Sequence, residues 1–176
     1  MKRAALGFKT HTGWAAVVAV AGGEVLLKRR IDMARDFATG AVFHAGQELP
    51  LERAKALIET SEARFVSLAR DAIASIVEEL QGYDVVASSI VAGNPKPLPP
   101  LEAILKSHPL VHAAEGALYR RVISRASEAC RIPAQTIALK NAGHASEIAA
   151  MGKKSGRPWA ADQKEAALAA LIALDG

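Results

Sequence analysis

Cysteine, aromatic residues and long apolar runs are all scarce in this sequence. The one cysteine, Cys130, has no partner for an intramolecular disulfide and excludes a zinc site built from several thiolates. Aromatic residues make up 5% of the chain and hydrophobic residues 51%, so the core must consist mainly of Ala, Val, Ile and Leu. This composition is typical of a sheet covered by helices.

No stretch approaches the roughly 20 consecutive apolar residues that a transmembrane helix needs. The start Met1-Lys2-Arg3 and the apolar run after it imitate a secretory signal, but Lys9 and His11 interrupt that run. We therefore expect a cytoplasmic protein with no membrane partner. A length of 176 residues predicts a single domain, 1–176.

Positive charge is concentrated at the start of the chain. The net charge is +4, and residues 1–35 contain seven Lys or Arg against two acidic residues. A basic edge of a sheet would produce this bias. The solvated surface of an ordinary enzyme explains it equally well.

Alternating and β-branched apolar residues predict three antiparallel strands at the start, with a Gly22-Gly23 turn between the last two. The strands cover residues 4–9, 14–20 and 24–32. Residues 33–49 are expected to be irregular or to contain a short fourth strand. Helical spacing predicts a helix over 51–80, which Thr60-Ser61, both good N-cap residues, would divide into two.

The second half of the chain predicts strands that alternate with helices. Four prolines within 94–100 exclude a helix interior or a central strand there. A strand, a helix and a strand in succession imply a right-handed crossover to a parallel partner. The remaining elements are strands at 83–92 and 135–139 and helices at 109–130, 144–154 and 163–174.

This order of elements resembles the ribonuclease H-like fold in its Holliday-junction-resolvase variant. Two sequence echoes accompany it, a His-Ala-Ala-Glu-Gly run at 112–116 and an Asp-Gln-Lys-Glu run at 162–165. The chain also resembles an uncharacterised bacterial family with a Lys-Thr-His-x-Gly-Trp start and no established activity. The resemblance implies an α/β fold with a five-stranded mixed sheet, three antiparallel strands plus two parallel, covered by helices, and an association with nucleic acid.

The sequence departs from this resemblance at the metal site. Nucleases of the fold hold two metal ions with three or four carboxylates, the first on the opening strand and another at the end of the fourth strand. Lys9 stands at the first position, and the fourth strand offers Ser88 and Ser89. Because a lysine brings positive charge where a divalent ion needs oxygen ligands, we do not expect the two-metal mechanism.

The first turn gathers hydrogen-bond donors on Lys9, Thr10, His11 and Thr12, and Lys140 is expected beside the same edge of the sheet. These residues predict an anion site for a phosphate of nucleic acid or of a phosphorylated small molecule. The alternative is a polar turn with His11 exposed.

His108, His112 and Glu115 are spaced by four and three residues, which places them on one side of a helix. This pattern predicts a site for zinc or a similar divalent metal ion, with His108 and His112 as ligands, or a proton-transfer pair of Glu115 and Tyr119. Otherwise Glu115 is a helix carboxylate bonded to a nearby arginine.

Asp162 is a candidate catalytic carboxylate, because the resemblance places one at the start of the terminal helix. Asp162 and Glu165 also form a capping-box pattern. We favour the capping role, which needs no distant partner.

Three functions remain open from the sequence. The first is a nucleic-acid-associated domain that binds phosphate or another anion without two-metal nuclease activity. The second is an enzyme of the hydrolase or phosphotransfer type, with or without a divalent metal, whose site combines Lys9, His11, Glu115 and Asp162. The third is a structural protein that forms a homodimer.

Overall fold

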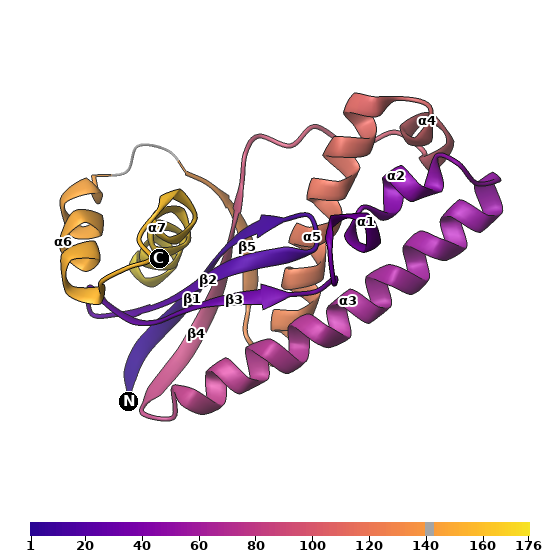
Figure 1. Cartoon of the computed structure of the whole chain (residues 1–176). Coiled ribbons are helices and arrows are strands. Elements are labelled where there is room, and N and C mark those ends of the chain that lie inside the picture. Colours follow the sequence, from indigo (N-terminus) through magenta and orange to yellow (C-terminus); the bar gives the residue numbers. More distant parts are fainter. Residues whose placement is uncertain (140–142) are drawn as a thin grey trace.

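The structure is a computed structural model that describes residues 1–139 and 143–176. Its strands are β1 (Lys2–His11), β2 (Trp14–Ala21), β3 (Glu24–Asp32), β4 (Tyr83–Ala92) and β5 (Ala134–Ala138). They form one mixed sheet in the order β3-β2-β1-β4-β5 (Figure 1). β2 pairs antiparallel with β1 and β3, whereas β4 pairs parallel with β1 and β5. The predicted α/β fold class, with three antiparallel strands and two parallel ones, is confirmed.

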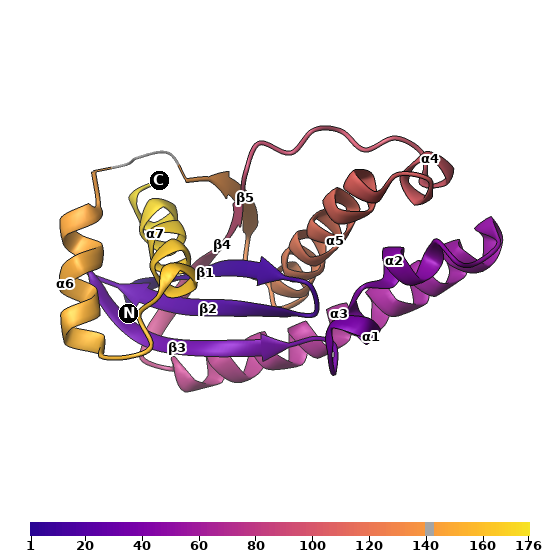
Figure 2. The ribbon, with the colours of Figure 1, turned by 45° about the horizontal axis from the view of Figure 1, so that its top comes forward.

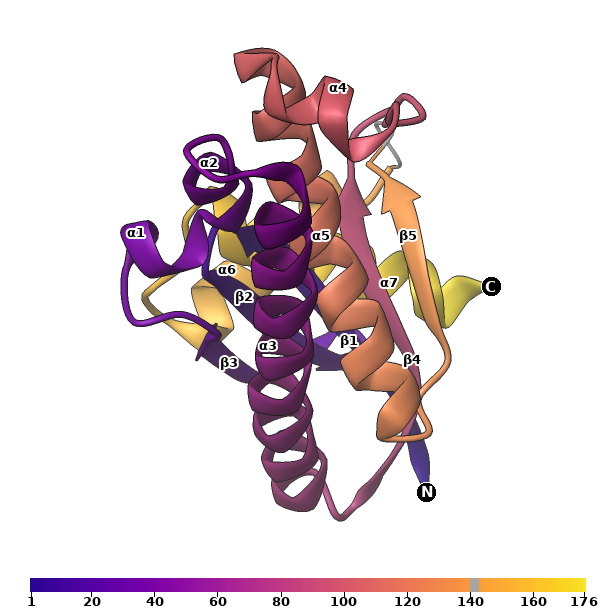
Figure 3. The same ribbon diagram turned by 90° about the vertical axis from the view of Figure 1, so that its right-hand side faces the viewer.

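Helices cover both faces of this sheet. The helices of the described residues are α1 (Phe37–Gly40), α2 (Val42–Gly46), α3 (Leu51–Glu79), α4 (Leu101–Leu105), α5 (His108–Ala129), α6 (Ala145–Ser155) and α7 (Ala161–Asp175). The long helices α3 and α5 lie side by side on one face, and α6 and α7 lie on the other (Figures 2 and 3). None of the described helices has the length and apolar character that crossing a membrane requires.

Side chains of β1 alternate between these two layers, as the period of two in a strand requires. Phe8 is fully buried in the core beneath α3 and α5, whereas Ala5 belongs to the core beneath α7. Gly7, Lys9 and His11 share the face of Ala5 and meet residues of α7. The alternation therefore points the two polar side chains at the end of β1 towards the terminal helix.

Glycine at position 7 allows α7 to touch the sheet. A Cβ atom placed on Gly7 would lie 1.7 Å from the carbonyl oxygen of Ala166 and 2.9 Å from the amide nitrogen of Ala170. The helix itself presents buried alanines to the strand, which keeps the approach close. This contact fixes the position of α7 over the end of β1.

Local structure differs from the expectation at three places. Residues 33–49 contain α1 and α2 instead of a strand, and Asp36 caps α1 by accepting a hydrogen bond from the Thr39 amide at 2.8 Å. The short helix α4 was not expected. Helix α3 runs unbroken through Thr60-Ser61, because Ser61 is buried and the apolar stripe continues on both sides of it. Tertiary packing there outweighs the local preference for a helix start.

Glu62 links the two long helices of one layer. It accepts hydrogen bonds from Arg121 at 2.8 and 2.9 Å and from Arg125 at 2.9 Å. The Glu62 side chain is 11% exposed, while the two arginines are 41% and 59% exposed. The hydrogen bond from Arg121 is the main reason that the pKa of Glu62 lies below its usual range.

We expect Glu62→Gln to lower the free energy of unfolding by about 1–2 kcal/mol at neutral pH, less than for a fully buried pair because the arginines reach solvent. Since the folded state lowers the pKa of Glu62, its stabilisation is present above the unfolded carboxyl pKa of about 4.3 and is lost as the pH falls through the folded value. Urea denaturation at several pH values should show the two proteins converging in acid. Glu78→Gln, an exposed position on α3, is the control, and a constant difference at every pH would contradict the charged link.

Candidate functional site

Four side chains from β1 and α7 meet at the hairpin end of the sheet. Lys9 Nζ lies 2.6 Å from Glu165 Oε2, and His11 Nε2 lies 3.0 Å from Asp162 Oδ1. Because an ionised carboxylate only accepts hydrogen bonds, Nε2 of His11 is the donor. We call these four residues the hairpin cluster.

The geometry of the two elements explains the hairpin cluster. Lys9 and His11 are two residues apart and share one face of β1. Asp162 and Glu165 are three residues apart and share one side of α7. The close approach of α7 at Gly7 sets the two pairs opposite each other.

Asp162 does not cap α7, so the favoured interpretation of this residue is wrong. Ala160 is the N-cap residue, and Gln163 Oε1 accepts a hydrogen bond from the Ala160 amide at 3.0 Å. The side chain that reaches back to the cap is therefore Gln163, one residue after Asp162. Both Asp162 and Glu165 are left to interact with β1.

Trp14 and Arg30, which sequence analysis did not single out as site residues, extend the hairpin cluster onto β2 and β3. The rings of His11 and Trp14, paired residues of the β1–β2 ladder, stack with centroids 4.3 Å apart and planes at 16°. The guanidinium carbon of Arg30 lies 4.0 Å from the centre of the Trp14 ring, a cation–π contact. The tight turn in the sequence indicates this contact, because it places His11 and Trp14 directly across from each other on neighbouring strands.

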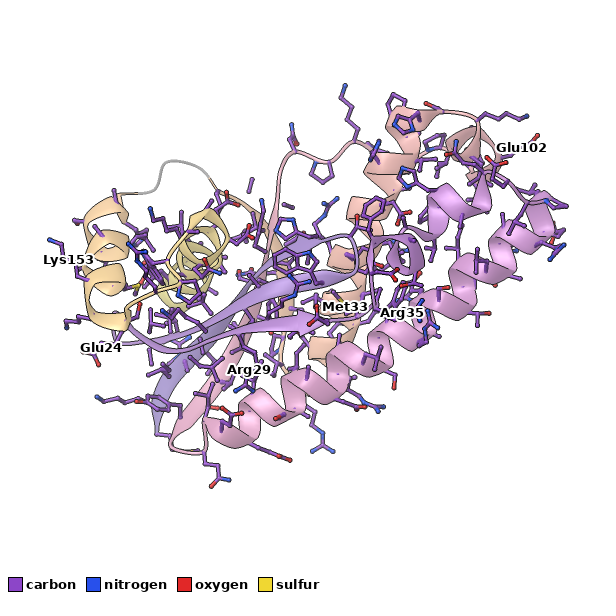
Figure 4. All side chains as sticks on the ribbon, in the orientation of Figure 1. Glu24, Arg29, Met33, Arg35, Glu102 and Lys153 are labelled. Carbon is purple, nitrogen blue, oxygen red and sulfur yellow. The ribbon has the colours of Figure 1, made fainter. Side chains whose placement is uncertain are left out.

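A shallow hollow of about 180 Å³ lies beside the first hairpin. Its lining includes Thr12, Trp14, Arg30, Arg35 and Phe37. Arg35 lies just beyond the end of β3 (Figure 4). Its side chain is 84% exposed, and Phe37 is 62% exposed. Arg30 and Arg35 each use the Nε–H for a neighbouring aspartate, at 2.7 and 3.3 Å. Their terminal amino groups make no hydrogen bond to the rest of the described chain and are free to meet a ligand.

The other predicted anion-binding residues are dispersed. Thr10 lies between Lys9 and His11 in β1, so it faces the opposite side of the sheet. Thr12 belongs to the turn and lines the hollow. Lys140 lies outside the described residues. The expected group of donors around the turn is therefore divided between the two faces.

The ammonium group of Lys9 offsets one of the two carboxylates of the hairpin cluster. The ammonium group of Lys9 meets the carboxylate of Glu165, and these side chains are 30% and 36% exposed. Ser88 and Ser89 of β4 are fully buried, and neither adds a carboxylate. A magnesium site needs several oxygen ligands of negative charge, so the hairpin cluster does not fit the metal ions of a two-metal nuclease.

A second polar cluster forms where α2 meets the start of α5. The Nε2 atoms of His108 and His112, one helical turn apart, are separated by 2.9 Å. His44 of α2 joins them, and one ring nitrogen from each of the three residues lies within 4.8 Å of the others. We call these three residues the histidine cluster. The sequence pattern does not point to His44 as a ligand, because His44 stands alone in a segment without recognisable periodicity.

Glu115 lies beneath the histidine cluster, with its side chain 3% exposed. Its Oε1 accepts hydrogen bonds from the Phe43 amide at 2.8 Å and from the amide and Nδ1 of His44, both at 3.3 Å. Burial raises the pKa of Glu115, and these hydrogen bonds oppose the rise. The Tyr119 hydroxyl donates to the carbonyl oxygen of Gly40 at 2.7 Å, so the expected pair of Glu115 with Tyr119 does not form. The arginine expected beside Glu115 is replaced by the amides and ring of α2.

The structure does not assemble the four-residue enzyme site. Lys9, His11 and Asp162 lie together on the face of the sheet that α7 covers. Glu115 lies on α5, in the layer that covers the other face. Two separate clusters take the place of one catalytic centre.

Comparisons with known proteins bear on the fold. No protein-family model matches the chain, and no curated protein sequence matches it. The structure of Thermus thermophilus RuvC in complex with a Holliday junction substrate is similar, with a TM-score of 0.55, 9% sequence identity, and 96% of this chain and 90% of the RuvC chain covered. A further T. thermophilus RuvC structure gives a TM-score of 0.53 at 12% identity, covering 96% of this chain and 91% of the other. The chain therefore has the ribonuclease H-like fold in its resolvase-like variant, as the order of elements predicted.

Proposed function

We propose that the protein is a nucleic-acid-binding domain that contacts phosphates and bases through the hollow beside the first hairpin and lacks two-metal nuclease activity. The grouping of Arg30 and Arg35 with Trp14 and Phe37 in this hollow carries the proposal. A guanidinium group pairs with phosphate oxygens through parallel N–H groups, and the exposed ring of Phe37 offers a face on which a base can stack.

The position of the hollow in the fold supports the same function. It adjoins the hairpin end of β1, beside the hairpin cluster. Because Lys9 and His11 already face carboxylates, we assign the phosphate contact to the two arginines, whose terminal amino groups reach solvent. The RuvC structure with a Holliday junction substrate makes a branched DNA the first ligand to test.

The proposed absence of two-metal chemistry rests on Lys9. Its ammonium group lies 2.6 Å from Glu165 and supplies the positive charge that a bound divalent ion would otherwise bring. We therefore expect a four-way junction to stay intact during incubation with the protein and Mg²⁺. Cleavage that depends on Mg²⁺ would contradict this part of the proposal.

We expect the protein to bind a labelled four-way junction or single-stranded DNA at low salt, and the double substitution Arg30→Ala with Arg35→Ala to weaken binding at least tenfold. Loss of two phosphate contacts should also reduce the slope of log K against log[salt] by about 1.5. Fluorescence anisotropy at several salt concentrations measures both quantities.

Arg70→Ala is the matched control for this experiment. Arg70 also pairs with the aspartate that follows it, but it lies on α3, away from the hollow. We expect this variant to bind like the unsubstituted protein. Quenching of tryptophan fluorescence by DNA should disappear in Trp14→Phe and persist in Trp159→Phe. No binding at low salt, or equal weakening by the control, would overturn the proposal.

A further inference from the structure

We propose that His44, His108 and His112 bind a divalent transition-metal ion, zinc being the ion that fits best, and that Glu115 is the positioning residue of this site. The proposal is independent of nucleic-acid binding, because the histidine cluster lies where α2 meets α5 and the hollow lies beside the first hairpin. It rests on the ligand geometry, on the buried carboxylate behind it and on the exposure of the rings.

The ring nitrogens of the histidine cluster are close to the spacing of ligands around one ion. Nitrogen ligands at 2.0–2.1 Å from a tetrahedral zinc ion lie about 3.4 Å apart. The Nε2 atoms of His108 and His112 are 2.9 Å apart, and all three ligand atoms lie within 4.8 Å of one another. Side-chain rotations would have to bring the three nitrogens to equal distances from one centre. Imidazole ligands favour zinc, copper, nickel and iron over magnesium or calcium.

A histidine that binds zinc ordinarily donates the N–H of its other ring nitrogen to a carboxylate or carbonyl oxygen, and Glu115 provides such an oxygen. Its Oε1 accepts a hydrogen bond from Nδ1 of His44, which fixes the tautomer and leaves Nε2 of His44 as the ligand atom. The same oxygen accepts two backbone amides of α2, so Glu115 holds both the backbone and the ring of His44. The ring is therefore held in place before any ion arrives.

Packing alone does not explain why, within the part of the chain that the structure describes, the second carboxylate oxygen of Glu115 is buried without a partner. Oε2 is buried and has no hydrogen-bond partner among the described residues. Burying a carboxylate with an unpartnered oxygen is costly unless positive charge lies nearby. A divalent ion bound to Nε2 of His44 would place that positive charge on the opposite side of the imidazole ring from Glu115.

Exposure of the ligands also favours a binding site over a packing contact. His108 and His112 are exposed, so their rings are not needed to fill the core. Three protein ligands on an exposed surface leave the fourth position of a tetrahedral ion to water. Bound zinc would join the five-residue helix α2 to the start of α5, and binding should therefore raise the melting temperature.

The test is zinc titration of the full chain without an affinity tag that contains histidine. Calorimetry after removal of metal by a chelator should show one zinc ion per chain with a dissociation constant in the micromolar range or tighter, and zinc should raise the melting temperature. His108→Ala and His112→Ala should each weaken binding at least tenfold. Both residues are exposed, so neither substitution should unfold the chain. His144→Ala, which removes the N-cap histidine of α6 outside the cluster, is the matched control and should bind like the unsubstituted protein.

Glu115→Gln tests the positioning role, because it keeps the shape of the side chain and all three ligands. We expect zinc affinity to fall about 10- to 100-fold, as it does when an outer-shell carboxylate is lost. With Co²⁺ in place of zinc, the visible absorption of the ion should also change in this variant, which a purely structural role of Glu115 would not produce. The metal site is overturned if the unsubstituted protein shows no saturable binding at micromolar zinc, or if His108→Ala and His112→Ala bind as tightly as His144→Ala. Unchanged affinity and an unchanged cobalt spectrum in Glu115→Gln would remove the positioning role.

Discussion

Replacing Lys9 by aspartate is expected to create a Mg²⁺ site where the unsubstituted protein has an ion pair. Lys9→Asp would place a third carboxylate beside Asp162 and Glu165, and carboxylate oxygens are ligands that Mg²⁺ accepts. At a Mg²⁺ concentration tenfold above the dissociation constant, binding adds about 1.4 kcal/mol to the free energy of unfolding. For a chain of this size the melting temperature should rise by about 3–6 °C.

The same substitution should cost stability when Mg²⁺ is absent. It removes the ion pair with Glu165, which is about one-third exposed, and adds a like charge, so we expect a loss of about 1 kcal/mol. Thermal denaturation with chelator and with millimolar Mg²⁺ measures both effects. Mg²⁺ also separates this site from the histidine cluster, because it binds imidazole poorly.

Lys9→Ala is the control for the aspartate variant. It removes the ammonium group without adding a ligand, so its response to Mg²⁺ should remain small. An equal Mg²⁺ response in the alanine and aspartate variants would show that Asp162 and Glu165 suffice for binding. A lack of response in Lys9→Asp would contradict the proposal that Lys9 takes the place of a metal ligand in this chain.

Gly7→Ala is expected to lower the free energy of unfolding by about 3 kcal/mol or more. The added methyl group would lie 1.7 Å from the carbonyl oxygen of Ala166 and 2.7 Å from its carbonyl carbon. These are backbone atoms that no rotamer change can move aside, so α7 must shift as a whole. The melting temperature should fall by about 6–12 °C.

Gly82→Ala is the matched control for the glycine substitution. Nothing lies within 4 Å of a Cβ placed at Gly82, and its φ is not positive. We expect a change within about 0.5 kcal/mol. Urea denaturation curves of the three proteins test the prediction. A loss below about 1 kcal/mol in Gly7→Ala would show that α7 can adjust its position at little cost.

A shift of α7 should also separate the hairpin cluster. Asp162 and Glu165 move with the helix, whereas Lys9 and His11 stay on β1. The rest of the sheet should tolerate the change, because Gly7 contacts α7 through one face only. The glycine therefore matters for the site as well as for stability.

The sequence by itself determined the order and type of the main elements. Alternation within β1, β2 and β3, and helical spacing in α3 and α5, are local properties that depend on which faces of each element are apolar. The predicted strands and long helices are therefore present within a few residues of their expected ends. The segment 33–49 has no such repeat, and its short helices α1 and α2 were not predicted.

Only the tertiary structure decided which polar side chains meet. Asp162 and Glu165 reach His11 and Lys9 because α7 packs directly on Gly7, a contact between segments far apart in the chain. His44 reaches the two histidines of α5 for a similar reason, since buried Glu115 holds α2 against that helix. Local periodicity shows which side of an element a residue occupies, but the partner across the gap depends on how closely the layers pack. The sequence predicted the first hairpin, Asp162 and the start of α5 as functional candidates. The fold added Glu165, Trp14 and Arg30 to the first group and His44 to the second.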